Sequence, residues 1–181
     1  MTAVFPDNSV AIDFAIVGKM DLLLEWIRDR GMVCEAVDLE MKDHVGEHQE
    51  MRDLIDALGV PIKLSRTESD AAEDIRRNRL GGTEERPRDH LGEAHTLFVL
   101  RERSALRGAV WLSDDVDSCE LAEFWSIRAM TSVDVLCELM VERGHTFHQE
   151  AFQIWVDMYA HPKGGCTRPT NLADMRRRAG L

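Results

Sequence analysis

The stretch Gly108-Ala-Val-Trp-Leu-Ser-Asp-Asp-Val-Asp117 decides the fold prediction. Its first six residues form a short apolar run of the kind that makes a buried strand. Three carboxylates follow, Asp114, Asp115 and Asp117, and burying unpaired carboxylates is energetically costly. This cluster must therefore face water, a cation or basic side chains. The simplest interpretation is an acidic turn that caps the next helix, because Asp is a favoured N-cap residue.

A second acid stands in the same setting, because Asp7 follows the short apolar segment Thr2-Ala-Val-Phe-Pro6. We expect a first strand over residues 3–6, followed by a helix over 10–17 that Ser9 caps. Further helices are predicted over 20–30, 36–58, 68–80, 89–103, 119–125, 133–143 and 147–159, and further strands over 32–34, 62–64, 108–113 and 127–130. This alternation predicts an α/β sandwich with a parallel sheet. Ligands of such sheets bind beyond the carboxyl ends of the strands, where Asp7 and Asp114/Asp115 fall.

Length and composition indicate one ordinary domain with enough apolar content to bury a core, since 44% of the 181 residues are hydrophobic. We expect this domain over residues 1–160, and a flexible basic tail over 161–181 that contains Arg176-Arg177-Arg178. The formal net charge of −11 argues against a protein that coats nucleic acid by charge alone. It leaves open an enzyme that holds cations against a phosphate substrate.

Nothing in the sequence predicts export or membrane insertion. The N-terminus has no basic region followed by an apolar core, and no apolar run approaches 18 residues. The cysteines lack the short paired spacing of a zinc knuckle or a disulfide framework; they are Cys34, Cys119, Cys137 and Cys166. These features predict a cytoplasmic protein without a membrane partner.

Two glutamates on predicted helices could join the aspartates around a cation. Glu40 lies in the helix expected from residue 36, and Glu93 lies near the start of the helix expected from 89. Other acids compete for the same places: Glu35 and Asp38 with Glu40, and Asp89 with Glu93. Together Asp7, Glu40, Glu93 and Asp115 would supply hard oxygen ligands that suit Mg²⁺ or Mn²⁺ and not zinc. A pair of such cations can activate water and stabilise the leaving oxygen in phosphodiester hydrolysis.

The ordered acidic motifs resemble those of PIN-domain proteins over residues 3–143. The motifs are Asp7-Asn-Ser9, Ala36-Val-x-x-Glu40, Leu91-Gly-Glu93-Ala94 and Ser113-Asp114-Asp115-Val-Asp117. The similarity is best to the bacterial and archaeal branch that includes toxin ribonucleases. Two positions depart from that pattern, because His95 stands where many relatives carry an acid and Glu35 replaces a small residue or proline.

The resemblance implies a three-layer α/β/α sandwich with a Mg²⁺ or Mn²⁺ site that cleaves single-stranded or structured RNA. It matches Asp7, Glu40, Glu93 and Asp115 to the four acidic positions and Ser9 to a hydroxyl residue that supports the first acid. It makes Asp114 and Asp117 neighbours that hold a second ion or orient water. It also implies the toxin of a toxin–antitoxin pair, with an antitoxin partner and a homodimer.

Several alternatives stay open at this level. A catalytically silent PIN-like module could bind a protein partner through an amphipathic helix over 147–159. A receiver domain would carry its acidic pair after the first strand, and a phosphatase of the haloacid dehalogenase type would replace Asp7-Asn-Ser9 with Asp-x-Asp. The groups that would bind substrate phosphates are unknown; the arginines in question are Arg76, Arg77, Arg79, Arg86, Arg88 and those of the tail.

Overall fold

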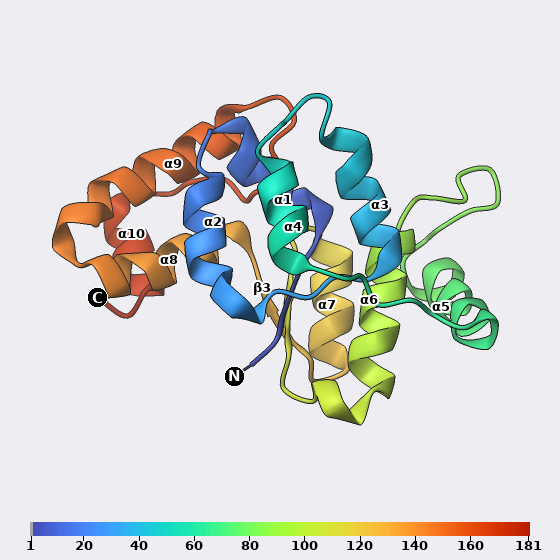
Figure 1. The fold of residues 1–181 in the computed structure, drawn as a ribbon. Coiled ribbons are helices and arrows are strands. Elements are labelled where there is room, and N and C mark those ends of the chain that lie inside the picture. Colours follow the sequence, from blue (N-terminus) through green and yellow to red (C-terminus); the bar gives the residue numbers. More distant parts are fainter. Residues whose placement is uncertain (1) are drawn as a thin grey trace.

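In the computed structural model, which describes residues 2–181, the chain is an α/β protein with a small, fully parallel sheet (Figure 1). The strands are β1 (Val4–Pro6), β2 (Val110–Leu112) and β3 (Arg128–Met130), in the spatial order β1-β2-β3. The α-helices are α1 (Asn8–Ile16), α2 (Met20–Ile27), α3 (Glu35–His44), α4 (Met51–Leu58), α5 (Arg66–Arg79), α6 (Leu91–Glu102), α7 (Val116–Phe124), α8 (Ser132–Arg143), α9 (His148–Ala160) and α10 (Leu172–Arg178). Single 3-10 turns are η1 (Arg28–Arg30), η2 (Ser104–Leu106) and η3 (His145–Phe147).

Helices cover both faces of the sheet because side chains alternate along each strand. On one face, Val4, Val110, Leu112 and Met130 join a core with helices α1 to α4 and α8 to α10. On the other face, Phe5 and Trp111 join a second core with α5, α6 and α7. The predicted α/β class with a parallel sheet is confirmed, and two cores on opposite faces are compatible with three layers.

Two predicted strands are wrong. Residues 32–34 and 62–64 share only one isolated bridge, Cys34 with Ile62, and the neighbouring Gly31 forms another with Val4. A single bridged pair does not form a strand. The apolar side chains of the first segment pack in the core instead. Cys34 and Val33 are both buried.

The long helix predicted over 36–58 is also wrong, because α3 ends at His44 and α4 begins only at Met51. Turns that contain Gly46 separate the two helices, and Gly is unfavourable in a helix interior. The break lets Met41 and Met51 both enter the same core. At the start of α1, the N-cap is Asp7 and not the predicted Ser9.

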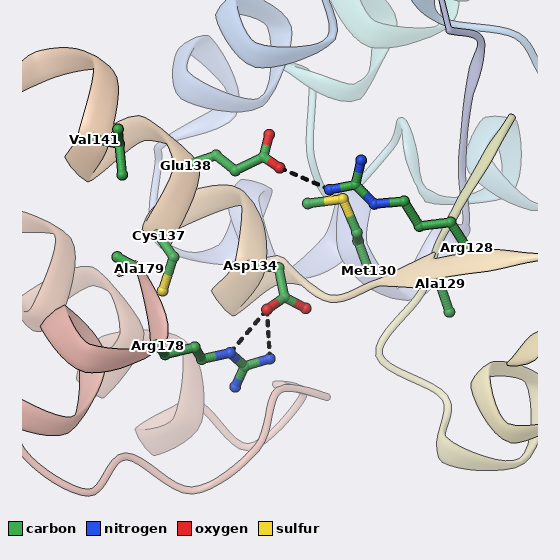
Figure 2. Close-up of a pocket in the computed structure, with 9 residues that line it drawn as sticks. All are labelled: Arg128, Ala129, Met130, Asp134, Cys137, Glu138, Val141, Arg178 and Ala179. Carbon is green, nitrogen blue, oxygen red and sulfur yellow. Dashed lines mark hydrogen bonds and ion pairs between the residues drawn. The ribbon is translucent and has the colours of Figure 1, made fainter. Parts of the chain in front are cut away.

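The segment 161–181, which we expected as a flexible tail, contains helix α10 and packs against α8 and α9. Met175 is fully buried, and Trp155 donates a hydrogen bond from Nε1 to the Thr167 carbonyl over 2.7 Å. Arg178 holds the Asp134 carboxylate with Nε and Nη2, at 2.8 and 2.7 Å (Figure 2). The expectation of a tail rested on the glycines and prolines of this segment and on its three consecutive arginines, whereas the structure shows apolar and charged contacts between the segment and the rest of the chain.

A cavity of about 390 Å³ lies where β3, α8 and α10 meet (Figure 2). Its charged groups pair with one another, since Arg128 also holds Glu138 at 3.0 Å. Within residues 2–181 no helix is both long and apolar enough to cross a membrane.

Candidate metal centre

Asp7 is fixed at the carboxyl end of β1. Its backbone N–H donates to the Leu112 carbonyl over 2.8 Å, which extends the pairing of β1 with β2 by one residue. The side chain is 3% exposed, and its Oδ2 accepts from the Ser9 amide (3.3 Å), the Ser9 hydroxyl (2.7 Å) and the Ser113 hydroxyl (3.3 Å). Burial raises the pKa of Asp7, and the hydrogen bonds from Ser9 oppose that rise. The Ser9 hydroxyl therefore contacts the carboxylate of Asp7, which is the contact expected of a supporting hydroxyl residue.

Asp115 occupies the matching position after β2. It is the N-cap of α7, and its Oδ1 accepts from the Ser118 amide over 2.7 Å. The simple interpretation of this turn as a helix cap therefore holds for Asp115, as it does for Asp7 on α1. Helix N-termini also favour anionic groups, and the two caps place negative charge at the carboxyl ends of the neighbouring strands β1 and β2.

Glu40 on α3 and Glu93 on α6 point toward the same place, because α3 and α6 pack against each other. Both glutamates line a cavity of about 280 Å³ together with Asp7; the other lining residues are Asn8, Ser9, Ile12, Lys163 and Gly165. Burial, with the nearby Asp7 charge, raises the pKa of Glu40 to about 7 and that of Glu93 to about 8. Carboxylates on four different elements thus repel one another across this site.

The acids that competed with these glutamates are used elsewhere. Asp38 is buried and bound by Lys42 at 2.6 Å, Glu35 pairs with Lys63 at 2.9 Å, and Asp89 lies 3.6 Å from Arg86.

Asp114 lies near Gly165 of the cavity lining, but its carboxylate accepts hydrogen bonds from Ser132 at the start of α8. Its Oδ1 accepts from the Ser132 amide over 3.1 Å, and its Oδ2 accepts from the Ser132 hydroxyl. Asp13 on α1, which the sequence analysis missed, lies next to it and is fully buried. Asp13 accepts from the Gly165 amide over 2.8 Å, and burial with the Asp114 charge raises the pKa of Asp13 to about 8. At neutral pH Asp13 is thus mainly protonated and able to donate to Asp114.

The structure does not bring Asp117 to the cavity. Asp117 is exposed in the first turn of α7 and lines a different surface hollow with Leu80 and Phe124. Asp114 and Asp115 precede α7 and Asp117 lies in its first turn, so the three side chains point in different directions: Asp115 caps the helix, half-buried Asp114 accepts from Ser132, and Asp117 is exposed.

His90 is a second residue that the sequence analysis missed. It is the N-cap of α6, and its Nδ1 lies 3.5 Å from Glu93 Oε1. Nδ1 is buried and has no hydrogen-bond partner within residues 2–181. His90, Glu93 and Asp115 each offer one possible metal-ligand atom, and these three atoms lie within 4.8 Å of one another.

The donor set fits a hard divalent cation. Asp7, Glu40, Glu93 and Asp115 offer carboxylate oxygens, which Mg²⁺ and Mn²⁺ prefer. Two observations favour a bound cation. The raised pKa values of the two glutamates reflect carboxylates that lack a compensating positive charge, and Nδ1 of His90 is buried without a hydrogen-bond partner. Comparison of the chain with protein-family models, curated proteins and solved structures gives no significant match.

Most of the arginines considered for substrate phosphates are bound within the chain. Arg76 is 1% exposed, Arg77 pairs with Glu73 and Glu84, and Arg88 lies 3.3 Å from Asp43. The basic residue that lines the cavity is Lys163, which no motif singled out and which pairs with Glu47.

Proposed function

We propose that the chain is a PIN-like, Mg²⁺/Mn²⁺-dependent ribonuclease that hydrolyses phosphodiester bonds in single-stranded or structured RNA, and that it acts as the toxin of a toxin–antitoxin pair. The observation that carries the proposal is the meeting of Asp7, Glu40 and Glu93 around one cavity, with Asp115 beside Glu93. When they are ionised, acids from four separate elements repel one another, and a bound cation would offset that repulsion.

Asp7, Glu40, Glu93 and Asp115 would hold the cation. When bound, it would neutralise phosphate charge and lower the pKa of water. Asp7 and Asp115 supply fixed oxygens, because each is oriented as a helix N-cap. The Glu40 carboxylate lines the same cavity as Asp7 and Glu93, so it is placed to take the proton of an attacking water. The water oxygen bonds to phosphorus, the bond between phosphorus and the leaving oxygen breaks, and the leaving oxygen receives the proton.

Lys163 supports a phosphate substrate from the rim of the same cavity. Its ammonium group pairs with Glu47, and both side chains are more than half exposed. An exposed pair of this kind contributes little stability, so a phosphate group can replace Glu47 at small cost. In a chain with a net charge of −11, a local cation of this kind would help RNA approach the acids.

The second candidate is a catalytically silent module that binds a protein partner, and the pairing of most of the arginines considered for substrate phosphates favours it. The helix first considered for that contact does not support it, because Ile154, Trp155 and Met158 of α9 are buried in the core. A more suitable surface is α7, where Val116 and Phe124 are 61% and 73% exposed.

The test combines metal binding with cleavage. Purified wild-type protein, Asp7→Asn and Asp115→Asn are titrated with Mn²⁺ while thermal melting is recorded, and each is then assayed on end-labelled single-stranded RNA. Asp56→Asn, an exposed change on α4, is the control. We expect Mn²⁺ to raise the melting temperature of wild type and control only, because a ligand that binds the folded state stabilises it. Metal-dependent cleavage that persists in Asp7→Asn contradicts the mechanism, and no metal response in wild type favours the silent module.

A further inference from the structure

The backbone at His90 is held in an unusual conformation. Its φ and ψ are 60° and 18°, in the left-handed region, which non-glycine residues adopt uncommonly. Among residues 2–181, only Arg28 and Ser126 share a positive φ without being glycine. Such conformations are unfavourable for non-glycine residues and persist where the surrounding structure fixes them. Here the conformation places the imidazole over the first turn of α6, beside Glu93 and next to the acidic cavity.

The spacing of the donor atoms suits joint coordination better than a direct hydrogen bond. His90 Nδ1 and Glu93 Oε1 are 3.5 Å apart, longer than the N–H···O distance of about 2.7–3.2 Å. Two ligands at about 2.1 Å from one octahedral ion are about 3.0 Å apart at right angles and about 4.2 Å apart when opposite. The donor atoms of His90, Glu93 and Asp115 all lie within 4.8 Å of one another, so small side-chain adjustments would complete the geometry.

The chemistry of the imidazole restricts the cation. Mg²⁺ prefers oxygen ligands and retains water, whereas imidazole nitrogen binds first-row transition metals such as Mn²⁺, Fe²⁺, Co²⁺ or Zn²⁺. A centre made only of carboxylates would distinguish Mg²⁺ from Mn²⁺ weakly. One nitrogen ligand in that centre would favour the transition metal.

We propose that His90 Nδ1 is a ligand of the same centre, with Glu93 and Asp115, and that it makes the site prefer Mn²⁺ or a related transition-metal dication over Mg²⁺. This inference rests on the proposed function, because it concerns the same cation site. It adds a residue and a metal preference that the four acids alone do not supply.

The loop before His90 is built to hold the imidazole in place. Buried Arg76 of α5 donates to three backbone carbonyls of that loop, those of Thr83 (3.0 Å), Arg86 (3.2 Å) and Asp89 (3.2 Å). The last of these carbonyls belongs to the residue that precedes His90. A ligand on an otherwise exposed loop is therefore fixed to the protein interior.

The test measures metal preference without requiring activity. Dissociation constants for Mn²⁺ and Mg²⁺ are determined by calorimetry for wild type, His90→Asn and the control His145→Asn, an exposed histidine in η3. Asn tolerates the left-handed conformation, so His90→Asn keeps the backbone while removing the nitrogen ligand. We expect Mn²⁺ affinity to fall about tenfold or more in His90→Asn, while Mg²⁺ affinity changes less than about threefold.

A spectroscopic measurement shows whether a histidine nitrogen binds the metal ion. Mn²⁺-loaded protein with ¹⁵N-labelled histidine is examined by pulsed electron paramagnetic resonance, and we expect a nitrogen coupling in wild type and control that His90→Asn loses. An unchanged Mn²⁺/Mg²⁺ ratio without nitrogen coupling overturns the inference. If Mn²⁺ binding then still depends on Glu93, tested as Glu93→Gln, the proposed function stands and His90 forms only an ion pair. If wild type binds neither cation, both proposals fail.

Discussion

Gly92 lies directly against the carboxylate of Glu40: a β-carbon at position 92 would stand 3.0 Å from both Oε1 and Oε2 of Glu40. The same atom would stand 2.8 Å from Cγ2 of Val37, which is closer than real β-carbon contacts allow. Gly92 therefore sets how closely α6 approaches α3. This close approach brings Glu93 and Glu40 to the same cavity.

Gly92→Ala should separate α3 from α6 and weaken metal binding. In an ordinary helix this change stabilises by roughly 0.5–1 kcal/mol. Here we expect a lower melting temperature and Mn²⁺ affinity reduced about tenfold, because Glu40 must move. Gly46→Ala is the matched control, since a β-carbon there has no heavy atom within 4 Å. A Gly92→Ala protein that melts higher and binds Mn²⁺ normally would contradict this account of the helix contact.

The parts of the site that the sequence predicted are those fixed by local rules. Asp7 and Asp115 follow short apolar strands, and chain direction alone takes them to one edge of a parallel sheet. Periodicity favoured Glu40 over Asp38 only weakly and did not separate Glu93 from Asp89, because tertiary packing decides which of these acids faces the cavity.

The missed residues depend on features without a sequence signal. Asp13 belongs to α1, which is buried on several sides, so no amphipathic pattern shows where its side chain points. His90 is itself in the left-handed conformation, which is uncommon for non-glycine residues, so the presence of a histidine does not predict it. The strand expected over 32–34 failed because a three-residue apolar run does not show whether a partner strand lies beside it.

Glu93 should make stability depend on pH. The pKa of Glu93 is about 8 in the folded chain against 4.5 for an ordinary glutamate. Between these values the folded state holds a proton that the unfolded state has lost, so stability falls as pH rises toward 8 and this contribution then levels off. Below about pH 4.5 both states are protonated and the effect vanishes.

Glu93→Gln removes this pH effect. In the presence of a chelator we expect the variant to melt several degrees above wild type at pH 8.5 and close to it at pH 4.5, since 1 kcal/mol corresponds to about 2–4 °C in a chain of this size. Melting curves across that range, with the exposed change Glu120→Gln as control, measure it. A constant difference at all pH values would show that burial, and not charge, determines the effect.

Asp13 should act as a neutral hydrogen-bonding group. Asp13→Asn keeps an acceptor for the Gly165 amide and a donor toward Asp114, so we expect a melting temperature close to that of wild type. Asp13→Ala removes the acceptor of the Gly165 amide and leaves a void at a fully buried position, so we expect this variant to melt at a lower temperature than Asp13→Asn. Thermal melting of the two variants at pH 7 compares them. Equal loss in both would mean that Asp13 is ionised and acts through its charge.

Arg76 should control the loop that carries His90. Arg76 combines its three loop carbonyls with the Glu73 carboxylate, which its Nε and Nη2 hold at 2.7 and 2.8 Å. Lysine keeps the charge but lacks the planar fork that reaches several acceptors at once. Arg76→Lys should therefore lower the melting temperature by several degrees and speed amide hydrogen exchange in residues 81–90.

The matched control is Arg77→Lys, because Arg77 is the next residue, is half-exposed and pairs with the same Glu73. Exposed ion pairs contribute about 0–1 kcal/mol, so this variant should behave like wild type. If His90 is a metal ligand, Arg76→Lys must also weaken Mn²⁺ binding more than Mg²⁺ binding, although residue 76 contacts neither cation. Faster exchange in residues 81–90 with an unchanged metal preference would separate the two roles: Arg76 would hold the loop, and His90 would not bind the ion.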